Sequence, residues 1–293
     1  METILAIDIG GTHQRFSLMD TQGKILEKIT YPSPRDISCD IFFQSLKERI
    51  FVHLKKGSSR GVAFALPIVI EEHIIQDAPN LSFLVGENLN HRLSFLSVPW
   101  TLENDANCAL LGEAWIGEGQ KESSFCCLTL GTGIGSGLFL DGKLWKGVHG
   151  MASEMGHLKI DFSGKFPCPC GDQGCLEAFA SALALQKKTR YSGQVLYQRA
   201  CQGEPVALKA FEEMGEFLGR GIGSVANLLN IDLFILAGQV SQAFQFFYPS
   251  CYRVAQESAM KGPRKYLKIV QSKLGDDAGL IGATYAWLKK HGR

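Results

Sequence analysis

The segment TILAIDIGGTHQRFSLM, residues 3–19, decides the fold because it sets two short strands on either side of a glycine turn. Residues 3–9 are apolar and β-prone, and residues 14–19 alternate as a second strand after Gly10, Gly11 and Thr12. Two strands separated by Gly-Gly indicate a β-hairpin with a primed turn. A Walker-type phosphate loop is excluded, since there is no Gly-Lys-Ser/Thr and a strand stands where a helix should begin.

The same pattern returns later in the chain. A third strand is expected at 24–31 after the first hairpin, and the second copy starts with a strand at 125–130. The glycine segment GTGIGSG at 131–137 follows, with more strand at 138–140 and 143–145. This segment lacks the G-x-G-x-x-G spacing and continues as a hairpin, which argues against a dinucleotide-binding fold.

The repeat predicts a two-domain nucleotide-binding protein. Two copies of one α/β unit facing each other across a cleft would bring both glycine turns to the same opening. Backbone N–H groups clustered in such turns favour anions, above all phosphates. We therefore expect a nucleoside triphosphate held between the two domains.

The remaining segments alternate between helix and strand. We expect helices at 41–54, 106–115, 176–189, 205–229, 241–260 and 276–290, and buried strands at 61–66, 98–102, 232–237 and 266–271. A chain of 293 residues favours two domains. The charged segment around Gly117 and Gly119 predicts the boundary. It separates an N-terminal domain of residues 1–118, rejoined by a C-terminal helix at 281–293, from a larger domain of residues 119–280.

Composition narrows the class of protein. The formal charge of +1, with both signs scattered along the chain, predicts no nucleic-acid or anionic-membrane partner. The longest apolar runs fall far short of the roughly 20 residues that a membrane helix needs, and no signal peptide is recognisable. Nine cysteines, an odd number, favour a reducing compartment. We expect a cytoplasmic α/β protein.

One histidine and three cysteines lie close together in GMASEMGHLKIDFSGKFPCPCGDQGCLE, residues 150–177. They are His157, Cys168, Cys170 and Cys175. Three thiolates and one imidazole form a closed tetrahedral zinc set, which is typical of a structural rather than a catalytic metal. Ordinary buried cysteines or a disulfide pair are the alternatives, and the close spacing of four ligands disfavours both.

These motifs together resemble those of the ROK family of sugar kinases and repressors, in the actin/hexokinase-like ATPase superfamily. The block CPCGDQGCLE downstream of SEMGH is highly specific to that family, and the matching segments span nearly the whole chain. They are DIGGT at 8–12, ENDAN at 103–107, GTGIGSG at 131–137, SEMGH at 153–157, CPCGDQGCLE at 168–177 and LGDDAGLIGA at 274–283.

The resemblance implies a fold and an activity. The fold is a two-domain α/β, actin/hexokinase-like architecture of duplicated ribonuclease H-like units, with ATP and sugar in the cleft between domains and a structural zinc knuckle. The activity is transfer of phosphate from Mg·ATP to the 6-hydroxyl of a hexose, with glucose favoured. N-acetylglucosamine, N-acetylmannosamine and fructose are open alternatives. A homodimer is also implied.

The resemblance assigns roles to individual residues. Asp8, Gly10, Gly11 and Thr12 form a first phosphate loop with Asp8 near Mg²⁺. Gly131, Thr132 and Gly133 form a second, and Gly238 faces the nucleoside. Sugar contacts fall on Asn104, Asp105, Glu154, His157 and Glu177, and zinc on His157, Cys168, Cys170 and Cys175.

Asp105 is the predicted catalytic base. A sugar hydroxyl is a poor nucleophile, so a carboxylate must take its proton during attack on the γ-phosphorus. Asp105 stands between a strand and a helix, where its other possible role is helix N-cap. His157 links two functions, because a ring nitrogen not bound to zinc can donate to a sugar oxygen. We hypothesise that the zinc knuckle shapes the sugar site without touching the phosphate chemistry.

The chain departs from the family pattern at two informative places. Ile68 stands where the sugar loop usually has Gly, and a β-branched residue resists positive φ. We therefore expect this loop to take another shape or to approach the sugar less closely. Ala237-Gly238-Gln239 replaces the usual Gly-Gly-Gly, and a side chain there is expected to narrow the nucleoside pocket or to change the base preference. A repressor would need a DNA-binding segment ahead of Asp8, where we expect no room. A non-catalytic sugar sensor is disfavoured because Asp105 and both glycine loops are intact.

Overall fold

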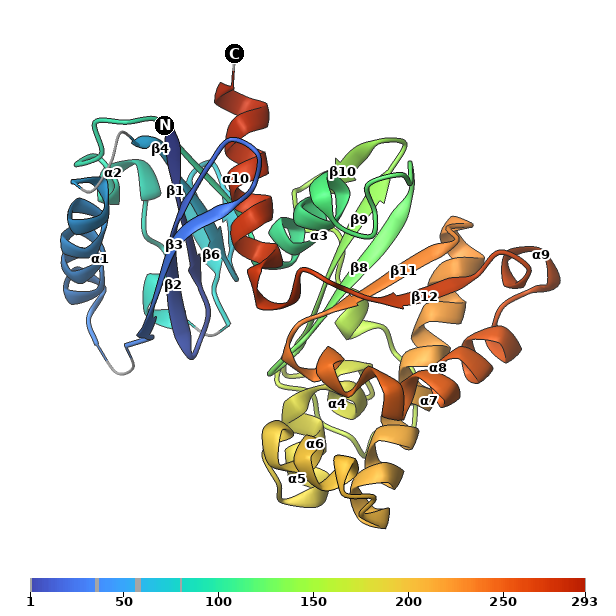
Figure 1. Ribbon diagram of the computed structural model, residues 1–293. Coiled ribbons are helices and arrows are strands. Elements are labelled where there is room, and N and C mark those ends of the chain that lie inside the picture. Colours follow the sequence, from blue (N-terminus) through green and yellow to red (C-terminus); the bar gives the residue numbers. More distant parts are fainter. Residues whose placement is uncertain (1, 35–36, 56–58, 80, 293) are drawn as a thin grey trace. The chain divides into compact units, whose positions relative to one another are not determined.

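The structure is a computed structural model that describes residues 2–34, 37–55, 59–79 and 81–292 (Figure 1). The chain forms two compact units. Unit 1 comprises Met1–Ile116, Lys146–Ala152 and Asp277–Arg293, and unit 2 comprises Gly117–Trp145 and Ser153–Asp276. The short segment at 146–152, which lies within the second half of the sequence, therefore belongs to unit 1.

Unit 1 is built on a five-stranded mixed sheet in the order β3-β2-β1-β4-β7. The strands are β1 (Thr3–Ile9), β2 (His13–Met19), β3 (Ile25–Pro32), β4 (Ser59–Leu66) and β7 (Trp100–Asn104). Strands β1, β2 and β3 form an antiparallel meander, whereas β1, β4 and β7 run parallel. The predicted hairpin is confirmed. The prediction of a primed turn between β1 and β2 is wrong, because neither Gly10 nor Gly11 has a positive φ.

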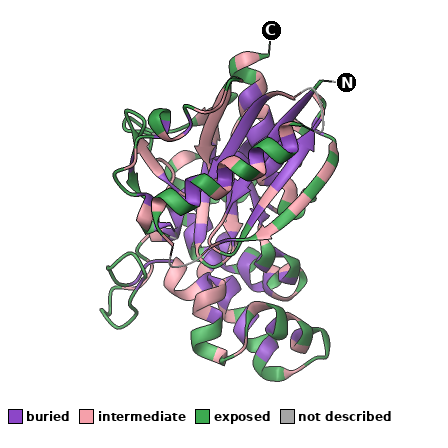
Figure 2. Cartoon of the chain, turned by 90° about the vertical axis from the view of Figure 1, so that its left-hand side faces the viewer, coloured by how far each residue is buried: buried purple, intermediate pink, exposed green. Residues whose placement is uncertain are grey.

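Helices cover both faces of this sheet, which explains why β1 is apolar at nearly every position. Leu5, Ile7 and Ile9 pack with α1 (Cys39–Leu54) in one core. Ile4 points the other way, toward α3 (Asp105–Ile116) and α10 (Ala278–His291). Figure 2 shows the strands buried and α1 exposed along its outer side. The smaller elements of unit 1 are β5 (Val69–Glu71), β6 (Ile74–Asp77), η1 (Ser82–Leu84) and α2 (Leu89–Arg92).

Helices α3 and α10 cross at two glycines that allow very close backbone approach. A Cβ on Gly282 would lie 1.6 Å from the carbonyl oxygen of Cys108. A Cβ on Gly112 would lie 2.5 Å from the carbonyl oxygen of Ala278. Further along α10, the buried Trp287 donates its indole N–H to the carbonyl of Pro99, 3.0 Å away. The C-terminal helix is thus fastened to the unit that contains the N-terminus.

Unit 2 repeats the sheet of unit 1, with the order β10-β9-β8-β11-β12. The strands are β8 (Phe125–Leu130), β9 (Ile134–Leu140), β10 (Lys143–Trp145), β11 (Leu233–Ala237) and β12 (Lys268–Gln271). Again the first three in sequence form an antiparallel meander, and β8, β11 and β12 run parallel. Both units therefore share one topology, which confirms the duplication that the two glycine turns predict.

The helices of unit 2 differ in part from the prediction. They are α4 (Glu177–Ala180), α5 (Ala182–Thr189), α6 (Gly193–Cys201), α7 (Pro205–Leu229), α8 (Phe244–Ser258) and α9 (Lys261–Arg264). Two 3₁₀ turns, η2 (Met155–His157) and η3 (Gln239–Ala243), also belong to this unit, and a third, η4 (Gly275–Asp277), leads into α10. The prediction of a single helix at 176–189 is wrong. Two helices, α4 and α5, meet at Ser181, whose hydroxyl caps α5 by accepting from the N–H of Ala184 at 3.1 Å. Helix α6 was not predicted.

Glycines inside α7 have a packing role. A Cβ on Gly215 or Gly219 would lie 2.3 or 2.5 Å from a carbonyl oxygen of α8. These residues let the two longest helices of unit 2 pack backbone to backbone. Within the described part of the chain, no helix combines the length and apolar character needed to cross a membrane.

Candidate active site and metal cluster

The first glycine turn joins β1 to β2 and is fastened from the side. Ser33, just after β3, donates its hydroxyl to the carbonyl of Gly10 at 2.5 Å, and its N–H to the carbonyl of Thr12 at 2.9 Å. Asp8 precedes the turn and is 9% exposed. One of its carboxylate oxygens accepts from the guanidinium of Arg15 at 2.8 Å. The turn therefore presents a mostly buried, charge-compensated carboxylate beside its backbone amides.

Arg15 was missed by the motif analysis, and strand register is the signal that identifies it. In the β1–β2 ladder Asp8 lies directly opposite Arg15. Cross-strand neighbours lie within side-chain reach, so counting outward from the turn pairs these two charges. A cation held against Asp8 in this way also leaves the surroundings of the turn less negative, which suits an anionic ligand.

The three parallel strands of unit 1 end at one edge of the sheet, where polar side chains gather. Asp8, Ala65 and Glu103 lie in one row across β1, β4 and β7. Asp105 follows two residues after Glu103 and begins α3. At about 4.8 Å per strand, β1 and β7 are about 10 Å apart. Ligands of α/β sheets bind at this carboxyl edge.

Asn104, and not Asp105, carries the main capping role at the start of α3. The side-chain oxygen of Asn104 accepts from the N–H of Ala106 at 2.9 Å and of Asn107 at 3.2 Å. Asp105 accepts from the N–H of the next residue, Ala106, at 2.9 Å. The capping alternative raised for Asp105 thus falls on its neighbour.

Glu103 is a second residue that the motif analysis did not single out. It is an acceptor for the N–H of Asn104 at 3.1 Å and for the side-chain amide of Asn107 at 3.0 Å. Its other oxygen pairs with Lys146, from the segment at 146–152 that belongs to unit 1. Glu103 thereby orders the strand-to-helix junction on which Asp105 stands. Spacing alone does not reveal this, because Lys146 is distant in sequence.

The second glycine turn joins β8 to β9 in unit 2. A Cβ on Gly131 would meet nothing within 4 Å, so the turn is open on that side. Gly133 is closed on its own side, because a Cβ there would lie 2.3 Å from a carboxylate oxygen of Glu177. Thr132 is exposed. The three predicted phosphate-loop residues therefore share one turn, with Glu177 packed directly behind it.

Gly238 follows β11 and lies beside the end of β8. Its φ of 86° and ψ of 173° belong to a region that only glycine adopts readily. A Cβ there would lie 2.6 Å from the carbonyl oxygen of Leu130, the residue before the second glycine turn. Gln239 is exposed and begins η3. The structure thus brings Gly238 and the Gly131 turn together in one unit.

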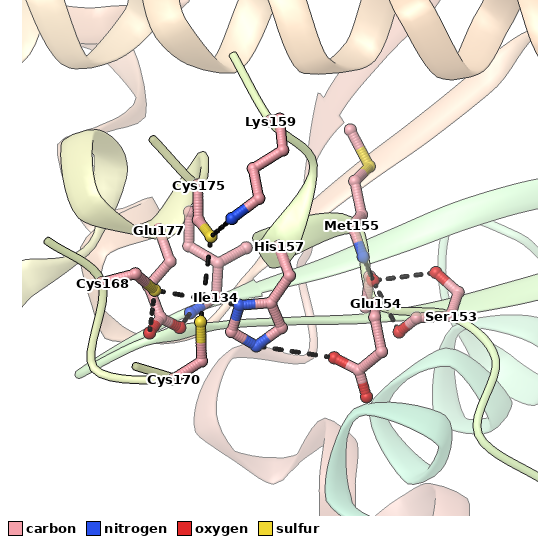
Figure 3. A network of polar contacts seen from close by, with 11 residues as sticks. Ile134, Ser153, Glu154, Met155, His157, Lys159, Cys168, Cys170, Cys175 and Glu177 are labelled. Carbon is pink, nitrogen blue, oxygen red and sulfur yellow. Dashed lines mark hydrogen bonds and ion pairs between the residues drawn. The ribbon is translucent and has the colours of Figure 1, made fainter. Parts of the chain in front are cut away.

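The four predicted zinc ligands converge in unit 2 (Figure 3). Their ligand atoms all lie within 4.8 Å of one another. Nδ1 of His157 is 3.8 Å from Sγ of Cys168, and Sγ of Cys170 is 3.8 Å from Sγ of Cys175. All nine cysteines are free thiols, so the disulfide alternative is wrong. Cys170 is exposed, so the alternative of ordinary buried cysteines does not cover the whole cluster.

The cluster fits a tetrahedral metal ion in both distance and donor chemistry. Zn–S bonds of about 2.3 Å at tetrahedral angles require sulfur atoms about 3.8 Å apart, which matches the Cys170–Cys175 separation. Burial raises the pKa of the Cys168 thiol to about 12, so metal binding must release its proton. Lys159 donates to Sγ of Cys175 at 3.2 Å, a contact that suits a thiolate.

His157 also contacts Glu154, a residue outside the cluster. Because Nδ1 of His157 faces the thiols, Nε2 is the ring nitrogen left for other contacts. It lies 3.8 Å from a carboxylate oxygen of Glu154, whose side chain is 60% exposed. Figure 3 shows the imidazole between the sulfur atoms and this carboxylate. The pair can offer one N–H donor and one acceptor to a polyhydroxylated ligand.

Glu177, which is predicted to contact the sugar, forms contacts with the second glycine turn and with the cysteine cluster. One of its oxygens accepts the N–H of Ile134 at 2.7 Å, at the end of the second glycine turn. The other oxygen lies 3.9 Å from Sγ of Cys168. The residue therefore contacts both the turn and the cysteine cluster, and its role as a sugar contact stays a prediction.

Ile68 lies in the loop that follows β4, and its side chain points into the core. Its side chain is 4% exposed and belongs to the core that contains α1. Its φ is not positive, and its N–H bonds to the carbonyl of Leu66 at 2.9 Å. The β-branched residue is thus accommodated by turning its side chain into the core, and the expected difference in loop shape stays a prediction.

Two topologically equivalent sheets, each with a glycine turn at the end of its first parallel strand, define the duplicated α/β fold of the actin/hexokinase-like superfamily. The sequence profile of the ROK family matches residues 4–290, and the chain belongs to this family.

Similar proteins include both enzymes and regulators. A glucokinase from Halalkalibacterium halodurans is 29% identical, over 98% of this chain and 94% of that protein. A xylose repressor from Caldicellulosiruptor bescii is 31% identical, over 76% of this chain and 61% of that protein. A solved ROK family glucokinase from Streptomyces griseus, in complex with glucose and AMPPNP, superposes with a TM-score of 0.86 at 27% identity, covering 97% and 98% of the two chains.

Proposed function

We propose that this protein transfers the γ-phosphate of Mg·ATP to the 6-hydroxyl of a hexose, with glucose as the substrate. The observation that carries the proposal is the placement of Asp105 at the carboxyl edge of the unit 1 sheet, on the same edge as Asp8. Similarity to the two glucokinases over nearly the whole chain supports the choice of sugar.

Asp105 is proposed as the general base. It stands at a junction ordered by the cap from Asn104 and by the contacts of Glu103. A carboxylate held in this way can take the hydroxyl proton as the sugar oxygen attacks phosphorus, which typically contributes ~10²–10⁴-fold. Because Asn104 supplies the main cap, the carboxylate of Asp105 is not required for that task.

Asp8 and the glycine turns are proposed to hold Mg·ATP. Asp8 would contact the magnesium ion or its water ligands, with Arg15 balancing its charge. The backbone amides of Gly10, Gly11 and Thr12, and those of Gly131, Thr132 and Gly133, would contact phosphate oxygens. Gly238 would lie near the nucleoside, in a turn that tolerates no larger residue.

The sugar contacts are proposed on Asn104, Asp105, Glu154, His157 and Glu177. His157 is the link to the metal cluster, since Nδ1 faces the thiols while Nε2 faces Glu154. N-acetylglucosamine, N-acetylmannosamine and fructose share most of the hydroxyl groups that these residues would read, so they are the competing substrates.

A zinc ion is proposed at His157, Cys168, Cys170 and Cys175. With four protein ligands it has no open position for substrate. It would supply a fixed geometry and no bond-making chemistry. We further propose a homodimer in a reducing cytoplasmic setting, to which nine free thiols are suited.

A coupled assay with Mg·ATP across glucose, mannose, fructose, N-acetylglucosamine and N-acetylmannosamine tests the function. We expect the largest kcat/KM for glucose. A larger value for an amino sugar or fructose would replace the substrate but keep the kinase. Binding of a sugar without turnover of any of the five would favour a non-catalytic sensor.

A further inference from the structure

Glu177 joins two parts of unit 2 that the sequence treats as separate. Glu177 follows Cys175 by two positions in the chain, so the Cys/His cluster fixes the position of the Glu177 backbone. Its side chain reaches the second glycine turn and accepts the N–H of Ile134 at 2.7 Å. Ile134 is 4% exposed. A nearly buried backbone donor that loses its acceptor is costly, so this bond strongly constrains the turn.

The same turn is held by the chain that follows Glu177. The N–H of Ala182, at the start of α5, donates to the carbonyl of Gly131 at 2.9 Å. The N–H of Leu183 donates to the carbonyl of Thr132 at 3.4 Å. Residues 177–183 therefore form hydrogen bonds with the turn at three residues, Gly131, Thr132 and Ile134. Any shift of this segment moves the phosphate-facing backbone with it.

The segment that carries His157 is attached to the same strand. A Cβ on Gly156 would lie 2.2 Å from the carbonyl oxygen of Ile134, so the two backbones are in direct contact. The N–H of Met155 donates to the hydroxyl of Ser136 at 2.9 Å. The segment that ends at His157 and the segment that runs from Cys168 to Glu177 thus both contact the start of β9. The ligand cluster holds these two segments together.

We propose that Glu177 is a positioning residue that couples the Cys/His cluster to the Gly131–Gly133 turn, so that the cluster controls nucleotide binding as well as sugar binding. This inference rests on the proposed function for the identity of the ligand, a nucleoside triphosphate. It replaces the hypothesis that the metal site acts on the sugar side alone. Loss of the side-chain oxygen that accepts from Ile134 weakens the phosphate site even when no sugar is present.

Two variants of Glu177 separate positioning from other roles. Glu177→Ala removes the acceptor for Ile134. Glu177→Gln keeps a side-chain oxygen at the same distance along the chain. Binding of Mg·AMP-PNP, measured by calorimetry without sugar, should weaken about tenfold in Glu177→Ala, because the nucleotide must then order a turn that has lost its bond between Ile134 and Glu177. Glu177→Gln should stay within about threefold of wild type.

Glu154→Gln is the matched control, because it alters the other carboxylate beside the cluster. We expect it to raise the KM for sugar and to leave the dissociation constant for Mg·AMP-PNP within twofold. Hydrogen exchange of the peptide that contains Ile134 gives a readout independent of any substrate. Exchange should accelerate in Glu177→Ala and in protein stripped of metal, and should be retained in Glu177→Gln.

Gly133→Ala provides a second, independent variant in case Glu177→Ala folds poorly. The new Cβ would lie 2.3 Å from the Glu177 carboxylate, and its φ is not positive. It should therefore weaken nucleotide binding in the wild-type background. In the double variant with Glu177→Ala the clash is gone, so adding Gly133→Ala should change the constant by less than twofold.

The outcomes distinguish this inference from the proposed function. If wild type phosphorylates a hexose but Glu177→Ala binds Mg·AMP-PNP as wild type does, with unchanged exchange at Ile134, the coupling is disproved and the kinase stands. If no hexose is phosphorylated by wild type, the proposed function fails, and the exchange data still decide whether Glu177 positions the turn. Equal, additive effects of Gly133→Ala and Glu177→Ala also contradict the coupling.

Discussion

At the scale of single residues, the sequence motif at 103–107 allows Asp105 to be either the catalytic base or the helix N-cap. In the structure the cap is mainly Asn104, so we propose Asp105 for the role of base. Asn104 bonds to two N–H groups of the first turn of α3, whereas Asp105 bonds to Ala106. Chemistry and capping can therefore be altered separately. Motif spacing was sufficient to predict that His157 and the three cysteines form one cluster, because they belong to a short local pattern. The roles of Asp105 as base and of the cluster as a zinc site stay predictions.

The contacts of Arg15 and Glu103 were less predictable. Arg15 needs the register of the β1–β2 hairpin, and Glu103 needs to meet Lys146 from a distant part of the chain. Glu177 is a third case. Its position after the last cysteine is local, but the bond to Ile134 depends on how two strands and the cluster fold together.

Asp105→Asn should abolish most of the activity without harming the fold. Asn keeps an oxygen that can accept from Ala106 but has no basic carboxylate. We expect kcat to fall by ~10²–10⁴-fold with the melting temperature unchanged within error. Asn104→Ala is the control: it should lower stability by about 1 kcal/mol through loss of the cap. Retention of more than a tenth of kcat in Asp105→Asn would remove Asp105 from the role of base.

Gly238→Ala should destabilise unit 2 through both φ and contact. The new Cβ would be 2.6 Å from the carbonyl oxygen of Leu130 at a φ of 86°. We expect a loss of about 3 kcal/mol in the free energy of unfolding. Gly142→Ala isolates the conformational part, because its φ is 76° and its Cβ would meet nothing within 4 Å. It should cost about 1–2 kcal/mol. Urea titration of both variants measures the difference, and equal losses would rule out the clash.

At the scale of elements, the strands and the long helices follow from periodicity, while the breaks between short helices do not. Helix α7 spans the predicted residues. Residues 176–189 look like one helix because their apolar spacing continues across Ser181. The break arises because Glu177–Ala180 follows the cysteine cluster, while α5 begins anew with its own cap.

Cys170→Ser should remove metal from the cluster. Metal analysis of the wild-type protein should find about one zinc per chain, and the variant should contain far less. Cys201→Ser is the matched control, since Cys201 is also an exposed thiol but belongs to α6. It should retain zinc. Full activity in wild-type protein that contains no zinc would exclude the metal proposal.

Gly282→Ala should disrupt the crossing of α3 and α10. Its Cβ would lie 1.6 Å from the carbonyl oxygen of Cys108, so the helices must separate, at a cost of about 2–3 kcal/mol. Gly279→Ala lies on the same helix, and its Cβ would come no closer than 3.6 Å to Asp8. Gain in helix propensity should make this control neutral or stabilising by up to about 1 kcal/mol. Thermal unfolding of the two variants compares them directly, and a neutral Gly282→Ala would refute the close packing.

At the scale of the whole molecule, the duplication is the feature that the sequence predicts best. The glycine hairpins at 10–12 and 131–133 belong to two sheets of equivalent strand order. The segment at 146–152, which joins unit 1 from within the second half of the chain, was not predictable. Its contact through Lys146 depends on the folded position of Glu103, and no local pattern in that segment indicates it.

Family membership narrows the function to sugar chemistry without choosing between enzymes and regulators, because the relatives include both. The intact carboxylate at Asp105 and the two glycine turns are the features that favour catalysis. Transfer of phosphate to a defined hydroxyl is therefore the central claim.

The direct test is an NMR spectrum of the product formed from glucose, Mg·ATP and the purified protein. We predict one new phosphate ester, whose phosphorus couples to the protons on C6, formed in equal amount with ADP and formed ~10²–10⁴-fold more slowly with Asp105→Asn. An ester at another carbon, ADP formed without any ester, or no turnover of any tested hexose would contradict the account.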